Sequence, residues 1–259
     1  MKIFDSHCHL DDKLYDHDLH RVMDRAENAG IAALMIVGIN RKTSEKAVSM
    51  AEATPWFYAS VGVHPHDAKH CGQATIDFLR NLAKRKKVHA WGEIGLDFNR
   101  MYSARKDQEK CFISQLQAGS ELNLPLIFHE RDSKGRFIEI LRSHLEQPAK
   151  GVVHCFSGTR EEMEQYLDFG LHIGITGILT VKGRGKKLRS LVPLIPENRL
   201  VIETDAPYLT PVPERNKHRR NEPAFVKSVL FKLAQVRKQD PEYLAKTLWD
   251  NTCRLFNIK

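Results

Sequence analysis

Short apolar segments rich in β-branched residues alternate eight times with longer amphipathic segments along this 259-residue chain. Apolar runs of this length are typical of buried strands, and the longer periodic segments are typical of helices. The predicted strands are Lys2–His9, Ala33–Ile39, Phe57–His64, Val88–Leu96, Pro125–His129, Gly151–Phe156, His172–Gly177 and Leu200–Asp205. The predicted helices are Asp18–Ala29, Ser44–Ala53, Ile76–Lys84, Arg105–Leu122, Ser133–Leu145, Thr159–Phe169, Gly185–Leu194, Glu222–Val236 and Pro241–Phe256. Strands that are separated by helices pair in parallel.

The eight units follow one another without a linker or a low-complexity stretch, which fits two kinds of parallel sheet. An open doubly wound sheet usually carries a glycine-rich phosphate turn after its first strand, and no such turn follows Lys2–His9. We therefore predict a single (β/α)8 TIM-like barrel that spans residues 1–259 as one domain. Because two helices follow the last strand, the barrel is expected to carry an extra C-terminal helix.

The composition is that of a soluble globular protein, with 42% hydrophobic and 28% charged residues. The five cysteines are odd in number, scattered and without a CxxC pair, which indicates reduced thiols and a cytoplasmic location. The N-terminal segment lacks the apolar core of a secretion signal, and the longest apolar stretch, Ile31–Ile39, is too short to span a membrane. The net charge of +8 favours anionic partners such as nucleic acid, although solvated helix faces account equally well for many of the cations.

Histidines and carboxylates gather at the C-terminal ends of the predicted strands. In a parallel barrel these ends meet at one mouth, where the active sites of such barrels form. The strand ends supply His7, His9, His64, Glu93, His129, His154, Glu203 and Asp205. A single histidine at a strand end is most often a structural residue, but this set at one level of a barrel predicts a metal site with two ions.

The stretch DSHCH at residues 5–9 shows how one strand can supply two ligands. Alternate side chains of a strand share a face. His7 and His9 are therefore expected to point into the mouth, and Ser6 and Cys8 are expected to point away from it.

We predict that two divalent ions share Glu93 as a bridging ligand. The predicted first site is His7, His9, Glu93 and Asp205, and the predicted second site is Glu93, His129 and His154. Asp205 is expected to orient the attacking water and to accept its proton, with Glu93 as the other catalytic residue. Glu203 shares a strand face with Asp205, so it is expected either to support a ligand from behind or to serve the structure alone.

The identity of the ions follows less directly from the ligands. Imidazole and carboxylate ligands suit zinc, manganese or iron. Magnesium usually prefers oxygen ligands and retained waters. We expect zinc or iron to co-purify with the protein, and magnesium or manganese to support turnover.

The chain resembles the TatD-type metal-dependent deoxyribonucleases of the amidohydrolase-like superfamily over nearly its whole length. The resemblance is carried by these motifs, in this order: DSHCHL, GVHPHD, GEIGLDFNR, LPLIFHERDS, HCFSGTREEM, IGITG, IETDAPYL and RRNEPA. It implies a TIM-like barrel that uses divalent metals to hydrolyse phosphodiester bonds in DNA, as a 3′–5′ exonuclease on single strands, with some members acting on RNA. The family's ligand positions fall on the six residues predicted above. Its third-strand histidine falls on His64, which is expected to contact a substrate phosphate or to support a ligand.

Two basic segments at the predicted mouth are candidates for phosphate contacts. VKGRGKK follows the seventh strand, and PERNKHRRNEP follows the eighth. Arg219 and Arg220 lie in a motif that the family shares, so we expect both to bind substrate, whereas the first segment fits a solvated helix start equally well. Tyr208 is expected to pack against a nucleotide or against its own loop. The GLDFNR loop after the fourth strand is expected either to line the site or to brace it.

Two other classes of function stay open. One is hydrolysis of a C–N or C–O bond, as in the amidohydrolases, including removal of amino acids from tRNA. Many binuclear amidohydrolases bridge their metals with a carboxylated lysine at the end of the fourth strand, where this chain has Glu93, which favours the phosphodiesterase. The other is a non-enzymatic nucleic-acid binder, which would not need converging carboxylates because they repel phosphate unless a metal intervenes.

Overall fold

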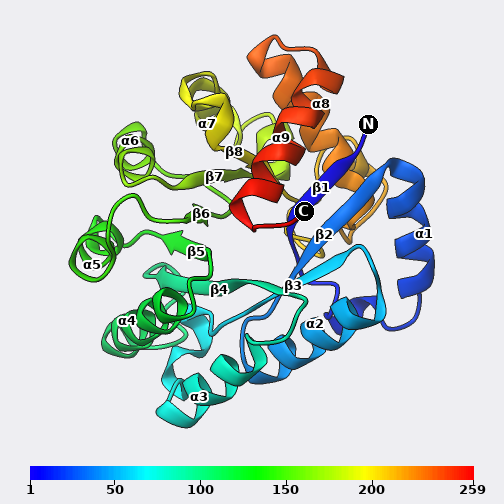
Figure 1. Cartoon of the computed structure of the whole chain (residues 1–259). Coiled ribbons are helices and arrows are strands. Elements are labelled where there is room, and N and C mark those ends of the chain that lie inside the picture. The colour runs from blue at the N-terminus through cyan, green and yellow to red at the C-terminus, as the bar shows by residue number, and fades with distance from the viewer.

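The computed structural model describes all 259 residues, and its strands form one sheet of eight parallel strands. The strands pair in chain order, from β1 beside β2 to β7 beside β8, and helices surround them (Figure 1). The strands are β1 Ile3–Cys8, β2 Ile31–Val37, β3 Phe57–Val61, β4 Val88–Asp97, β5 Leu126–Arg131, β6 Gly151–Val153, β7 His172–Ile175 and β8 Leu200–Ile202. The predicted (β/α)8 TIM-like barrel is confirmed.

The barrel closes between β1 and the segment that follows β8. A parallel bridge joins Cys8 to Ala206. The backbone N–H of Asp205 donates to the carbonyl of His7 at 2.9 Å, and the N–H of His9 donates to the carbonyl of Ala206 at 2.7 Å. Closure therefore falls at the C-terminal end of the strands, among the predicted metal ligands.

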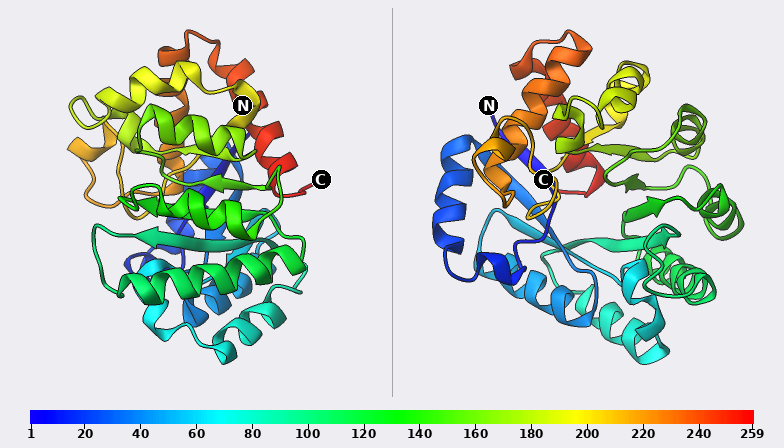
Figure 2. Two further views of the ribbon diagram at one scale, coloured as in Figure 1. Left: turned by 90° about the vertical axis from the view of Figure 1, so that its left-hand side faces the viewer. Right: turned by 180° about the vertical axis from the view of Figure 1, so that it is seen from behind.

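The chain has nine α-helices, and helices cover the outside of the barrel in both views of Figure 2. They are α1 Leu19–Ala29, α2 Arg41–Ala53, α3 Gln73–Leu82, α4 Arg105–Glu121, α5 Arg136–His144, α6 Arg160–Asp168, α7 Lys186–Leu191, α8 Val226–Arg237 and α9 Pro241–Leu255. Helices α1 to α8 each follow the strand of the same number, and α9 is the expected extra helix. None of the helices has the length and apolar character needed to cross a membrane.

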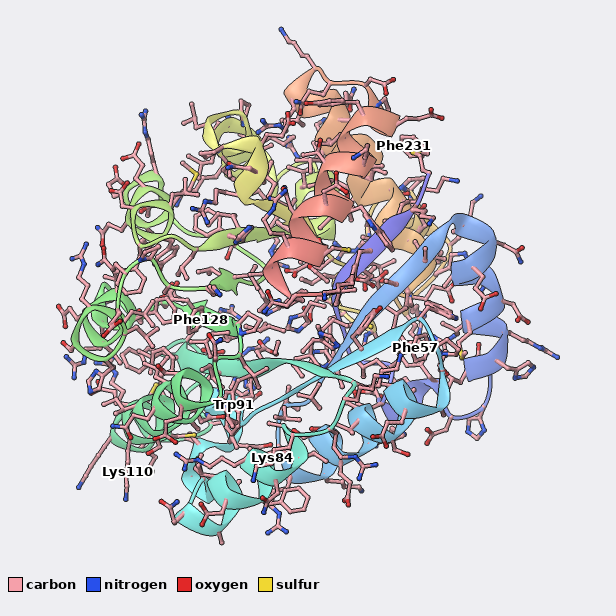
Figure 3. The ribbon with its side chains drawn as sticks, in the orientation of Figure 1. Phe57, Lys84, Trp91, Lys110, Phe128 and Phe231 are labelled. Carbon is pink, nitrogen blue, oxygen red and sulfur yellow. The ribbon has the colours of Figure 1, made fainter.

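Two apolar layers stabilise this arrangement. Sixty buried residues fill the space between strands and helices, where Trp91 and Phe128 lie (Figure 3). A separate cluster of ten fills the inside of the barrel: Phe4, Ala33, Met35, Val37, Ala90, Ile127, Val152, Val201, Leu255 and Phe256. Leu255 is the last residue of α9 and Phe256 follows it. The C-terminal end of the extra helix therefore closes the barrel at the N-terminal end of its strands. Burying each large side chain contributes roughly 1.5–3 kcal/mol.

Several strands are shorter than the sequence predicts. Strands β6 and β8 end at Val153 and Ile202, so His154 and Asp205 lie just beyond them. Cys155 and Asp205 have φ angles of 49° and 57°, in the left-handed region, which turns the chain out of the strand direction. Of the six predicted ligands, His7, Glu93 and His129 thus lie within strands, whereas His9, His154 and Asp205 lie just after them.

Candidate metal centre

The closure of the barrel brings together the residues of the first predicted metal site. The Nε2 atoms of His7 and His9 lie 3.3 Å apart. His7 Nε2 lies 3.4 Å from Glu93 Oε2 and 3.8 Å from Asp205 Oδ1. His9 Nε2 lies 3.5 Å from Asp205 Oδ1 and 3.9 Å from Glu93 Oε2. Four donor groups therefore surround one small volume; they come from β1 and the residue after it, from β4, and from the segment after β8.

The residues of the second predicted site meet at the other oxygen of Glu93. His129 Nδ1 lies 2.9 Å from Glu93 Oε1, and His154 Nε2 lies 3.0 Å from the same atom. Glu93 is almost fully buried, at 2% exposure. Its carboxylate therefore lies between the two groups of histidines, with one oxygen facing each.

This donor set fits divalent metal ions. Two nitrogens that bind one tetrahedral zinc ion at about 2.1 Å lie about 3.4 Å apart, and the spacing of the His7 and His9 Nε2 atoms is close to that value. His9 Nδ1 lies 3.0 Å from the carbonyl oxygen of Val37, which places a proton on Nδ1, so that the neutral ring binds a metal through Nε2. Three overlapping groups have ligand atoms within 4.8 Å of one another: His7, His154 and Asp205; His7, His9 and Glu93; and His64, Glu93 and His129.

His64 lies at the edge of this set. Its Nε2 is 3.5 Å from Glu93 Oε1. Its Nδ1 accepts a 3.1 Å hydrogen bond from the backbone N–H of His66, so the proton of a neutral ring is on Nε2. Burial holds the pKa of His64 well below its usual value, which favours the neutral ring. His64 therefore presents an N–H donor beside Glu93.

Asp97, at the end of β4, supports His129 from behind. Its Oδ2 lies 3.3 Å from His129 Nε2 and 2.8 Å from His66 Nε2. Its Oδ1 accepts backbone hydrogen bonds from Asn99 and Arg100 at 3.0 Å and 2.7 Å. Although burial opposes ionisation, the hydrogen bonds with the two histidines lower the pKa of Asp97. The GLDFNR loop thus braces the site, which the sequence left undecided between two roles.

Glu203 occupies a matching position behind His154. Its Oε1 lies 3.3 Å from His154 Nδ1 and accepts a 2.6 Å hydrogen bond from the backbone N–H of Cys155. Ser6 donates a 3.2 Å hydrogen bond to Glu203 Oε2. The prediction that Ser6 points away with Cys8 is therefore wrong, because the pairing of β1 with β2 shifts register between Asp5 and Cys8 and breaks the simple alternation.

The histidines keep both carboxylates of the centre ionised. Burial alone would raise the pKa of Glu93, but the charge of His154, together with the hydrogen bond from His129, holds it well below its usual value. Burial also opposes ionisation of Asp205, and the hydrogen bond with His9 together with charged neighbours lowers its pKa. Burial lowers the pKa of His9, but its contact with the Asp205 carboxylate and the charges of other nearby carboxylates together outweigh burial. The pKa of His9 is therefore raised to about 9.

Two adjacent hollows open beside the centre. The central hollow, of about 450 Å³, is lined by His129, Glu130, Arg131, Asp132, His154, Cys155, Ser157, Gly158, Glu162, Ile178, Arg184, Lys187, Leu188, Asp205 and Leu209. The arginine hollow, of about 470 Å³, is lined by Ile178, Val181, Arg184, Pro207, Tyr208, Leu209, Thr210, Arg215, His218 and Arg219. Three residues, Ile178, Arg184 and Leu209, line both. Arg219 therefore lies next to the centre without being part of it.

Arg220 does not fit the substrate-binding role that the sequence predicts. Its guanidinium makes two 2.7 Å hydrogen bonds with the carboxylate of Asp18 and one of 2.6 Å with the carbonyl of Leu14. It also lies over the ring of Tyr15, 4.6 Å from the ring centroid. These contacts use the side chain to join the loop after β8 to the loop after β1, whereas Arg219 lines the arginine hollow.

A family profile, curated relatives and solved structures all relate this chain to TatD-type proteins. The sequence profile of the family described as "TatD related DNase" matches residues 4–257. The chain is 43% identical over 259 residues to the "3'-5' ssDNA/RNA exonuclease TatD" of a Rahnella species, which covers 99% of this chain and 98% of that protein. It is 42% identical over 258 residues to the protein of the same name from Escherichia fergusonii, with 99% of each covered. Among solved structures, a TatD homologue from Escherichia coli, YjjV, superposes with a TM-score of 0.90 at 28% identity, covering 99% of this chain and 98% of that one.

Proposed function

Because the chain belongs to the family of TatD-related DNases, we propose that it removes nucleotides from the 3′ end of single-stranded DNA, and also of RNA, by metal-dependent hydrolysis of phosphodiester bonds. The observation that carries this proposal is the position of Glu93. One of its oxygens lies 3.4 Å from His7, and the other lies 2.9 Å from His129 and 3.0 Å from His154. A carboxylate with histidines at both oxygens is suited to bridge two ions.

We propose that His7, His9, Glu93 and Asp205 hold the first ion, and that Glu93, His129 and His154 hold the second. Two divalent ions would lower the pKa of water and stabilise negative charge on the phosphate oxygens. The imidazole-rich ligand set favours zinc or iron as the ions that co-purify, while magnesium or manganese would support turnover.

The side chains around the centre would supply the remaining steps. The Asp205 carboxylate would orient the attacking water and accept its proton. The Nε2–H of His64 would donate to a phosphate oxygen, since its ring is neutral and its Nδ1 already accepts from His66. Arg219 would bind a phosphate of the strand from the neighbouring hollow. Glu203 and Asp97 would hold His154 and His129 in orientation.

A time course on end-labelled single-stranded DNA tests this proposal. The protein is stripped with EDTA and then supplied with zinc, manganese, iron or magnesium in separate reactions. We expect a ladder that shortens from the 3′ end, that disappears with chelation and returns with metal. Hydrolysis of a cyclic amide, a lactone or an aminoacyl-tRNA ester, with no cleavage of DNA or RNA, would contradict it.

A further inference from the structure

The hollows around the mouth differ in charge. The central hollow carries three cations but also the carboxylates of Glu130, Asp132, Glu162 and Asp205. A third hollow on the other side of Tyr208, here called the β1 hollow, is lined by His9, Asp11, Asp12, Lys13, Asp16, Ile39, Lys42, Thr43, Lys46 and Tyr208, so its acids balance its lysines. The arginine hollow has three arginines and no carboxylate in its lining. A polyanion is attracted most strongly to the hollow without carboxylates.

The three arginines of this hollow are free to bind an anion. The guanidinium groups of Arg184, Arg215 and Arg219 are exposed and form no hydrogen bond or ion pair within the protein. Arg189 on α7 differs from them, because its guanidinium donates to the carbonyls of Leu179, Val181 and Lys182 at 2.9, 2.9 and 2.5 Å. Arg189 thus holds the backbone of the loop that carries Arg184. The Arg184 side chain itself has no partner within the protein.

The loop carrying Arg184 also packs closely against the segment before it. A Cβ atom at Gly185 would lie 2.4 Å from the carbonyl oxygen of Ile178. Only glycine allows this approach. The position of the loop is therefore set by the fold before any substrate arrives.

Tyr208 forms one wall of the same hollow. Its side chain is 54% exposed, and its ring lies 6.1 Å from the ring of His9 at the metal centre. Its backbone is held on both sides, since its N–H donates to the carbonyl of Asp205 at 2.8 Å and its carbonyl accepts from Asn221 Nδ2 at 2.6 Å. An exposed aromatic ring on a fixed backbone, beside unpaired arginines, is the combination that binds a base and its phosphate.

We propose that the arginine hollow is a subsite for the nucleotide next to the one being removed, with its base stacked on Tyr208 and its phosphates bound by Arg184, Arg215 and Arg219. This inference rests on the proposed nuclease activity. The strand would cross from the metal centre over Ile178 and Leu209, which line both hollows, and the nucleotide being removed would occupy the central hollow. The braced loops make the subsite preformed, so binding costs little ordering of the protein.

Substrate length separates this subsite from the metal centre. The holoenzyme and the variant Arg215→Ala/Arg219→Ala are assayed on a thymidine decamer and on a dinucleoside monophosphate, which has a single phosphate. We expect KM for the decamer to rise about tenfold or more, and KM for the short substrate to change far less.

The stacking role of Tyr208 is tested separately. Tyr208→Ala is expected to raise KM for the decamer about fivefold or more, and Tyr208→Phe to restore it because the ring remains. The control Lys84→Ala/Lys86→Ala removes the same charge after α3, where Figure 3 labels Lys84, and leaves both KM values unchanged.

Binding of a labelled decamer in EDTA gives a measurement independent of turnover. The salt dependence, as the slope of log K against log salt concentration, should flatten by about 0.7 for each arginine removed. An equal loss on both substrates, no loss on either, or an unchanged salt slope would overturn the subsite. If the wild-type protein cleaves no phosphodiester with any metal, the proposed function fails instead, and the salt slope still decides whether the hollow binds nucleic acid.

Discussion

The two ends of the barrel interior are built from opposite kinds of residue. At the N-terminal end of the strands, Leu255 and Phe256 complete the apolar cluster that fills the inside of the barrel, and Phe256 packs 6.3 Å from Phe4, ring centroid to ring centroid. At the C-terminal end, buried imidazoles surround the buried carboxylate of Glu93. Burying charged groups costs free energy unless they are paired or bind a metal. The comparison indicates that one end stabilises the fold while the other end uses part of that stability for a metal centre.

Among tests of this contrast between the two ends of the barrel, Glu93→Ala is expected to have the largest effect. Loss of the shared carboxylate should remove both ions and lower the rate of DNA hydrolysis by at least about 10³-fold. Elemental analysis and the end-labelled DNA assay measure the two effects together. Asp132→Ala, which removes a carboxylate at the rim of the central hollow, should keep its metal. Full activity with bound metal in Glu93→Ala would refute the assignment.

The opposite end is tested by Phe256→Ala. The side chain is fully buried under the barrel, so its loss should lower the free energy of unfolding by about 3–5 kcal/mol. Because Phe256 lies away from the mouth, the activity per folded molecule should stay close to that of the wild type. Urea denaturation measures the free energy of unfolding. Titration of the protein with metal measures metal affinity and the number of active sites, from which the activity per folded molecule follows. A drop in metal affinity without a drop in stability would show that the two ends are coupled.

Asp97→Asn sharpens the comparison within the mouth. The amide keeps the size of the side chain but loses the charge that orients His129 and His66. Affinity for the second ion should fall about 10- to 100-fold, with a smaller change for the first. Isothermal titration with zinc resolves the two sites. Equal weakening of both sites would mean that Asp97 supports the whole mouth and not His129 in particular.

The periodic parts of the sequence predicted the fold well. Eight apolar segments, separated by helices, gave all eight strands in their order, because periodicity reports which face of an element is buried. The histidines and carboxylates at strand ends were then placed together by barrel geometry, since every parallel strand ends at the same mouth.

Features set by irregular backbone did not follow from the sequence. Arg219 and Arg220 are neighbours of the same type, yet only Arg220 is held by Asp18, because the loop after β8 has no periodicity that fixes side-chain direction. The register shift in β1 moved Ser6 toward Glu203, and no sequence pattern marks it. Asp97 also contacts His66, which reaches it from the segment after β3.

The smallest expected effect concerns protons at the polar end of the barrel. With its pKa raised to about 9, His9 is protonated at neutral pH in the metal-free protein, and its Nε2 must lose that proton to bind an ion. Metal affinity should therefore fall as the pH falls below 9, about tenfold per pH unit for each proton released. Titration calorimetry at pH 7.5, in two buffers of different ionisation enthalpy, counts the protons and should find at least one. A buffer-independent heat would mean that the imidazoles are already neutral, and that the ionised carboxylates of Glu93 and Asp205 await the metal without protonated partners.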